Sequence, residues 1–149
     1  MQRSCATALV LSALAVLVLS VGCVEETPAA WVPEEHHLPA VFSELSYEEA
    51  RAAAEADGKI LIVDATARWC VPCGKMDRTT WVDENLVSWI AEHAIAIQVD
   101  VDWQVKTARQ LEVRPPIPIV VVYKDGEELS RVVGYQSGDE LLRWLQGAL

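Results

Sequence analysis

Basic residues are scarce in this sequence. Its 149 residues include 12 Lys and Arg against 22 Asp and Glu, which gives a formal net charge of −10. Nucleic-acid binding needs clustered Lys and Arg against phosphates, so the composition disfavours that class of function. The acidic excess is typical of a well-solvated surface. The length suits a single domain with a core of its own.

The sequence also lacks a long apolar run of the kind that crosses a bilayer. The segment "ALVLSALAVLVLSV" from Ala8 to Val21 is shorter than the ~20 residues a spanning helix needs. One basic residue, Arg3, precedes it, and no further charge follows until Glu25. A short basic start before a short apolar core is typical of an export signal, so we predict a signal peptide over residues 1–22.

The end of this segment, "LSVGC" from Leu19 to Cys23, resembles the bacterial lipobox, although Ser20 stands where that motif prefers Leu. The resemblance implies that Cys23 is lipidated and becomes the first residue of the mature protein. It also implies a periplasm-facing lipoprotein of the bacterial cell envelope, held on the inner or outer membrane without a spanning helix. An uncleaved anchor and ordinary signal cleavage nearby are the alternatives.

Cysteine is rare as well. Cys5 would leave with the signal and Cys23 would carry the lipid, so Cys70 and Cys73 alone would remain as free thiols. One close pair is too little for a disulfide-stapled scaffold. Loss of Arg3 leaves 11 basic and 22 acidic residues, a charge of 11 − 22 = −11.

The rest of the chain divides into a tether, residues 23–44, and a domain, residues 45–149. Residues 24–41 of the tether contain three prolines and four glutamates and have no helical or strand period, and we assign no metal-binding role to the pair His36-His37. In the domain, capping signals and apolar periodicity predict helices and strands in alternation. The expected helices are 46–58, 71–79, 84–93, 104–111 and 137–149, and the expected strands are 59–66, 94–101, 117–123 and 127–134. This order implies an α/β fold with a mixed sheet covered by helices on both faces.

The pair in "WCVPC" stands between a predicted strand and a predicted helix. Pro72 suits the first turn of a helix, where no backbone donor is lost, so Cys70 should sit at the helix N-terminus. Unpaired N–H groups and the helix dipole favour its thiolate there and lower its pKa. Cys73, three residues on, lies on the same face, near enough to attack a mixed disulfide on Cys70. We expect Cys70 to be exposed and Cys73 to be sheltered.

Other readings of the pair need features that are missing. A closed zinc site needs four ligands, and a structural disulfide across so short a loop gains little stability. A Cu(I) site remains open, because thiolates suit that ion, with Met76 as the nearest other soft ligand.

The stretch "VDATARWCVPC" closely resembles the active-site region of thioredoxins, and the resemblance continues through "IPIVVVYKDGEEL" and "GYQSGDELLRWL". It implies the thioredoxin fold over residues 45–149. It also implies that Cys70 is the nucleophile, Cys73 the resolving thiol and Trp69 an aromatic lid. Asp64 corresponds to the buried acid that exchanges a proton with Cys73, and burial at a strand end would raise its pKa.

Pro118 corresponds to the family's cis-proline, which faces the cysteine pair, although Pro115 or Pro116 could be cis instead. Gln98 stands where many thioredoxins have a lysine near the buried acid. The segment after Cys73 lacks the usual proline kink and looks closer to the C-terminal domain of membrane thiol:disulfide interchange proteins.

The resemblance implies a membrane-tethered enzyme that reduces protein disulfides and is itself reduced by a membrane thiol:disulfide electron donor. The redox-active Cys70–Cys73 disulfide would serve without a further cofactor or metal. Reduction is favoured over oxidation because Val71 and Pro72 separate the cysteines. In strong oxidases of this fold, the two residues between the cysteines resemble Pro-His, and a charged histidine there would further stabilise the thiolate and hence the reduced enzyme. The alternative is a copper(I)-handling lipoprotein of the same fold in oxidase or cytochrome assembly.

Overall fold

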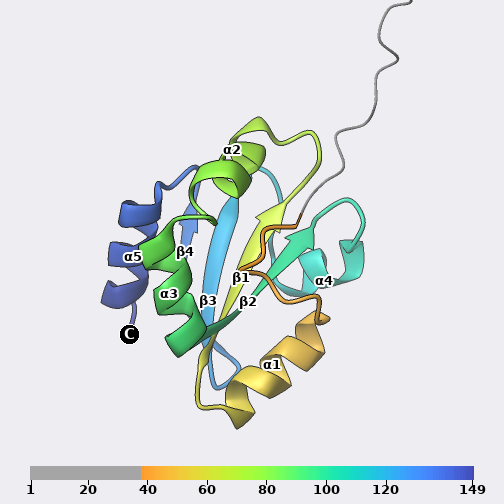
Figure 1. Ribbon diagram of the computed structural model, residues 1–149. Coiled ribbons are helices and arrows are strands. Elements are labelled where there is room, and N and C mark those ends of the chain that lie inside the picture. The colour runs from red at the N-terminus through yellow and green to blue at the C-terminus, as the bar shows by residue number, and fades with distance from the viewer. Residues whose placement is uncertain (1–37) are drawn as a thin grey trace, which may run out of the picture. The chain divides into compact units, whose positions relative to one another are not determined.

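The computed structural model describes residues 38–149 (Figure 1). The predicted signal peptide, Cys23 and the tether up to residue 37 lie outside the described residues. The described elements follow the predicted order: α1 (Tyr47–Ala56), β1 (Ile60–Thr66), α2 (Val71–Thr79), α3 (Glu84–His93), β2 (Ala94–Asp100), α4 (Val105–Gln110), β3 (Ile119–Lys124), β4 (Glu127–Val133) and α5 (Gly138–Gly147). Within this part of the chain, no helix combines the length and apolar character needed to span a bilayer.

The strands form one mixed sheet in the order β2-β1-β3-β4. β1 pairs with β2 in parallel and with β3 antiparallel, and β3 pairs with β4 antiparallel. All seven residues of β1 are buried, as expected for a central strand covered on both faces. The predicted α/β class with a thioredoxin-type sheet is therefore confirmed.

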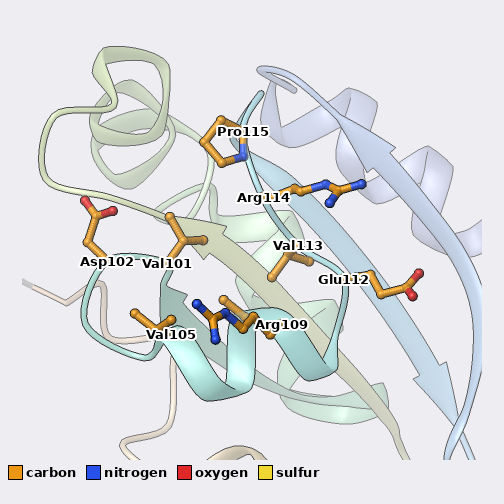
Figure 2. Close-up of a pocket in the computed structure, with 9 residues that line it drawn as sticks. Val101, Asp102, Val105, Arg109, Glu112, Val113, Arg114 and Pro115 are labelled. Carbon is orange, nitrogen blue, oxygen red and sulfur yellow. The ribbon is translucent and has the colours of Figure 1, made fainter.

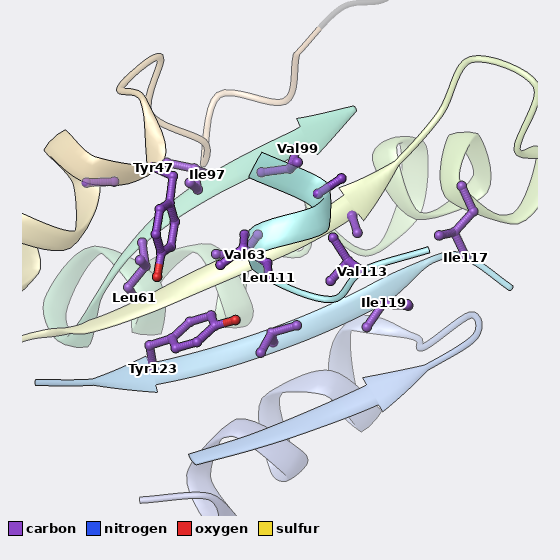
Figure 3. Packing of buried hydrophobic residues seen from close by; sticks show 14 of the residues in the cluster. Tyr47, Leu61, Val63, Ile97, Val99, Leu111, Val113, Ile117, Ile119 and Tyr123 are labelled. Carbon is purple, nitrogen blue, oxygen red and sulfur yellow. The ribbon is translucent and has the colours of Figure 1, made fainter. Parts of the chain in front are cut away.

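Two apolar clusters fill the two faces of the sheet. Successive side chains in a strand point to opposite faces of the sheet. Leu61 and Val63 of β1 therefore face one side, and Ile60 and Ile62 face the other. The first cluster joins Leu61 and Val63 to α1 and α4 (Figure 3). It also includes both cysteines of the pair. The second joins Ile60 and Ile62 to α2, α3 and α5. The cysteines thus sit at the edge of a packed core.

Local sequence signals explain where the main helices begin. Ser46 and Ser137 each form a complete capping box, with Glu49 and Glu140 returning a hydrogen bond to the cap. β3 begins at Ile119, later than the predicted 117, because Pro118 has no N–H to give to a strand partner.

The folded domain begins before residue 45. Phe42 is buried, and its ring meets that of Trp81 edge-on with centroids 4.8 Å apart. The Ser43 N–H donates to the carbonyl of Ala96 on the β2 edge at 2.8 Å. Residues 38–44, which we placed at the end of the tether, therefore begin the packed structure.

Candidate redox site

A disulfide joins Cys70 and Cys73 at the N-terminus of α2, where the sequence placed them. Cys70 is the N-cap residue, and its sulfur accepts a hydrogen bond from the Cys73 N–H at 3.3 Å. Pro72 occupies the first turn, which needs no donor from it. The free N–H groups of this turn and the helix dipole point at Cys70, an arrangement that stabilises a thiolate there once the disulfide is opened.

The cysteines differ less in exposure than predicted. Cys70 is 5% exposed and Cys73 is 1% exposed, because both pack into the first apolar cluster while they are bonded to each other. Cys70, which we expected to be exposed, is therefore only slightly accessible in the disulfide form. Its neighbours Trp69 and Val71 are exposed, at 58% and 80%.

Trp69 is held over the surface by a hydrogen bond that the sequence did not reveal. Its indole Nε1–H donates to the Asp102 carboxylate at 2.7 Å, across a separation of 33 residues. The adjacent Trp103 is 72% exposed, and the Arg68 guanidinium lies 5.3 Å from its ring centroid. The disulfide therefore opens onto a surface with two exposed indoles.

Asp64 is buried at 1% exposure, as predicted, but it lies within β1 and not at its end, because the strand continues to Thr66. Gln98 is its register partner on β2, and the Gln98 amide donates one hydrogen bond to Asp64 at 3.0 Å and another to Asp77 of α2 at 2.9 Å. Burial raises the pKa of Asp64 to about 7. The Gln98 hydrogen bond lowers that pKa and the nearby Asp77 carboxylate raises it. The Trp81 indole also lowers the pKa of Asp64, although the Trp81 N–H does not meet the geometry of a hydrogen bond.

The peptide bond between Ile117 and Pro118 is cis, in the conformation we predicted. The bond between Pro115 and Pro116 is cis as well. Ile117 packs in the same cluster as the two cysteines, and the Pro118 carbonyl accepts from the Gly134 N–H at 2.8 Å. The fold thus brings the proline segment, from a distant part of the sequence, to the cysteine pair.

Met76 does not join the cysteines. It is fully buried in the second cluster, on the other face of the sheet from Cys70 and Cys73. Within residues 38–149, no group of three or more His, Cys, Asp or Glu side chains is arranged to hold a metal ion.

Sequence reasoning missed Asp77 and Asp102. Asp77 follows Cys73 by four residues, a spacing that places both on one face of a helix, so its position beside the buried acid was open to inference. Asp102 follows β2 in a turn, and nothing local in the sequence indicates that it meets Trp69.

The fold and the cysteine pair define a thiol:disulfide oxidoreductase of the thioredoxin type, and comparisons with known proteins agree. A model of the thioredoxin-like family matches residues 43–124, more than half of the chain. The chain belongs to the thioredoxin-like family.

Individual relatives point the same way. The chain is 33% identical over 109 residues to an H-type thioredoxin of Fagopyrum esculentum, a match that covers 73% of this chain and 89% of the plant protein. It is 28% identical over 105 residues to the thiol:disulfide interchange protein DsbD of Campylobacter jejuni, covering 68% of this chain. That match spans only 18% of DsbD. A solution structure of a thioredoxin from Thermus thermophilus superposes with a TM-score of 0.60 at 27% identity, over 68% of this chain and 82% of the other.

Proposed function

We propose that this protein is a membrane-tethered reductase of protein disulfides, facing the periplasm of a bacterial cell envelope. The observation that carries the proposal is the Cys70–Cys73 disulfide at the N-terminus of α2, the helix whose Asp77 shares the Gln98 amide with the buried acid Asp64. Cys70 and Cys73 are the cysteines of the described residues, and we assign the redox chemistry to them.

In the first step, the Cys70 thiolate of the reduced protein attacks one sulfur of a substrate disulfide. A new bond joins Cys70 to that sulfur, the substrate S–S bond breaks, and the other substrate sulfur leaves as a thiolate. The N-cap position supports the attacking thiolate. Trp69 and Val71, on either side of Cys70, are exposed and offer apolar surface on which the substrate can rest.

In the second step, Cys73 resolves the mixed disulfide. Its thiol gives a proton to the Asp64 carboxylate, and the resulting thiolate attacks the Cys70 sulfur. The second substrate thiolate leaves, and the Cys70–Cys73 disulfide remains with two electrons passed to the substrate. An acid with a pKa of about 7 is half ionised near neutral pH, so Asp64 is suited both to accept and to return this proton.

The direction of electron flow is proposed from the residues around the cysteines. Val71 and Pro72 carry no positive charge that would further stabilise the thiolate and make the pair a strong oxidant. Arg68, two residues before Cys70, lies against Trp103. The similarity to an interchange protein supports a membrane thiol:disulfide donor as the source of electrons, and substrate proteins with disulfides as the recipients.

The membrane attachment is proposed from the lipobox resemblance at Cys23. A lipid there would hold the domain at a membrane surface through the predicted tether. The Cys23→Ser variant should then move from the membrane fraction to the soluble fraction after cell lysis. An unchanged distribution of that variant would refute the lipid anchor.

Insulin reduction tests the enzymatic proposal. Cys70→Ser should abolish turnover with dithiothreitol as the electron source, because no thiol remains to attack the substrate. Cys73→Ser should instead accumulate a mixed disulfide through Cys70, visible as a mass increase on intact protein. Full activity of Cys70→Ser would show that this mechanism is wrong.

A further inference from the structure

Three buried side-chain atoms of residues 38–149 have no hydrogen-bond partner: Asp64 Oδ1, Thr66 Oγ1 and Trp81 Nε1. Buried polar groups are nearly always paired, so each of these atoms needs an explanation. Asp64 and Trp81 complement each other, because a carboxylate oxygen is an acceptor and the indole N–H is a donor only. Both side chains are 1% exposed, so solvent does not supply the missing partner to either of them.

The fold places Asp64 and Trp81 on the same side of the sheet. Asp64 follows Ile60 and Ile62 at two-residue intervals in β1, so its side chain faces the second apolar cluster, to which Trp81 belongs. Of the other two unpaired atoms, the Trp81 Nε1–H is the one that acts on the ionisation of Asp64. The cavity of about 550 Å³ beside α4 does not reach the acid, since its lining residues fall between 101 and 115 (Figure 2).

The protonation of Asp64 decides whether a hydrogen bond with Trp81 can form. Asp64 Oδ2 accepts from the Gln98 amide at 3.0 Å, so the proton of the neutral acid is carried by Oδ1. A protonated Oδ1 is itself a donor, and it then presents a hydrogen to the indole N–H, which is also a donor. Once Asp64 is ionised, Oδ1 is an acceptor. A bond from the buried N–H to this carboxylate is then charge-assisted and stronger than a neutral one.

We infer that Trp81 is a positioning residue of the resolution step: its indole N–H donates to Asp64 while the carboxylate is ionised, and moves off Oδ1 when that oxygen takes the proton of Cys73. The inference rests on the proposed reductase function. Phe42 supports this role, because its ring meets that of Trp81 edge-on with centroids 4.8 Å apart and holds the indole in the second cluster. The start of the folded domain is thereby connected to the buried acid.

The charged surroundings of Asp64 are simple. Asp77 of α2 is the charged group that acts on it, and it opposes Trp81 because it disfavours the ionised acid. The register partner of Asp64 on β3 is the apolar Val120, and its partner on β2 is the uncharged Gln98. The side chains that α3 and α5 bury on this face are apolar as well: Leu86, Ile90, Leu141 and Leu145.

The test follows the two thiols that the reduced protein releases from a small neutral aromatic disulfide. Release of the first thiol reports attack by Cys70, and at saturating disulfide the release of the second reports resolution by Cys73. Trp81→Phe removes the N–H and keeps an aromatic ring in the core. Trp144→Phe is the matched control, because it makes the same chemical change in a half-buried indole that packs against the same cluster without acting on Asp64.

We expect Trp81→Phe to move the inflection in the pH profile of the second release upward by about one pH unit, because ionised Asp64 loses a donor. Near neutral pH, resolution should then be roughly fivefold slower, since a smaller fraction of Asp64 is ionised. The first release should keep its wild-type rate. Trp144→Phe should leave both releases unchanged. An inflection that stays at the wild-type pH in Trp81→Phe would overturn the inference, as would equal slowing of both releases.

A second measurement keeps the wild-type core, in case Trp81→Phe does not fold. In the reduced, ¹⁵N-labelled protein, the indole proton of Trp81 is identified by NMR through its contacts with the Phe42 ring. Its resonance should move downfield as Asp64 ionises and should stay fixed over the same pH range in Asp64→Asn. A Trp81 resonance that does not respond to pH in the wild type would refute the inference. Absence of the first thiol release from the wild type would instead be a failure of the proposed function itself, distinguishable from these results.

Discussion

At the scale of single residues, Asp64 is the group whose chemistry burial changes most. Its pKa rises from 3.8 to about 7, chiefly by desolvation, so the folded protein holds a proton that the unfolded chain releases between these values. The wild-type protein is therefore most stable in acid, as far as this group is concerned. It loses that stability as the pH rises from about 4 to about 7.

Asp64→Asn should therefore stabilise the disulfide form near about pH 8, by on the order of 3–4 kcal/mol as an upper limit for three pKa units. The gain should disappear near about pH 3, where Asp64 is neutral in both states. Urea unfolding at the two pH values measures this difference. A gain of equal size at both would mean that Asn merely packs better.

Asp77 offers a second residue-scale prediction. Its carboxylate shares the Gln98 amide with Asp64 and raises the pKa of Asp64. Asp77→Asn should lower that pKa and move the inflection in the pH profile of mixed-disulfide resolution to lower pH. Arg78→Gln, an exposed change one residue along α2, serves as the control. An inflection that stays in place in both variants would separate Asp77 from the chemistry.

The sequence predicts some of the residues of this site and not others. Cys70, Cys73, Asp64 and Pro118 could be found because they fall in a compact motif or at a fixed relation to a strand. The Trp69–Asp102 hydrogen bond could not, since it depends on where the turn after β2 meets the loop after β1.

At the scale of helices and strands, the N-terminus of α5 packs closely on the N-terminus of α3. Asp83 caps α3 by accepting from the backbone N–H groups of Asn85 and Leu86. A Cβ at Gly138 would lie 2.6 Å from the Asp83 side chain, so the two helix starts require glycine there.

Gly138→Ala should therefore destabilise the protein by about 1–3 kcal/mol, because Asp83 must move and its cap is strained or lost. Gly147→Ala at the other end of α5 is the matched control, since nothing lies within 4 Å of a Cβ there. Thermal unfolding of the two variants provides the comparison. Equal stabilities would contradict the packing described for these helices.

The element order was predictable because its signals are local. The capping boxes at Ser46 and Ser137 lie within four residues of each helix start, and β1 is a short apolar run of the kind a central strand needs. The start of the domain was not, because Phe42 becomes part of it only through contact with Trp81, 39 positions further along.

At the scale of the whole molecule, Phe42 tests where the domain begins. Phe42→Ala should lower the free energy of unfolding by about 3 kcal/mol, because it leaves a cavity against Trp81. Leu45→Ala, at an exposed position in the same segment, should change it by about 0.5 kcal/mol or less. Chemical unfolding followed by tryptophan fluorescence distinguishes the two. A neutral Phe42→Ala would return residues 38–44 to the tether.

The molecule combines a sheet covered on both faces with a redox pair at the N-terminus of α2 and, by our proposal, a lipid on Cys23. The reduction potential of the Cys70/Cys73 pair tests this combination most directly. It can be measured by equilibrating the protein in graded dithiol buffers and trapping the free thiols. We predict a value near about −270 mV, comparable to thioredoxin and suited to donating electrons. A value near about −120 mV would mark an oxidant, and would contradict the reductase function proposed for this protein.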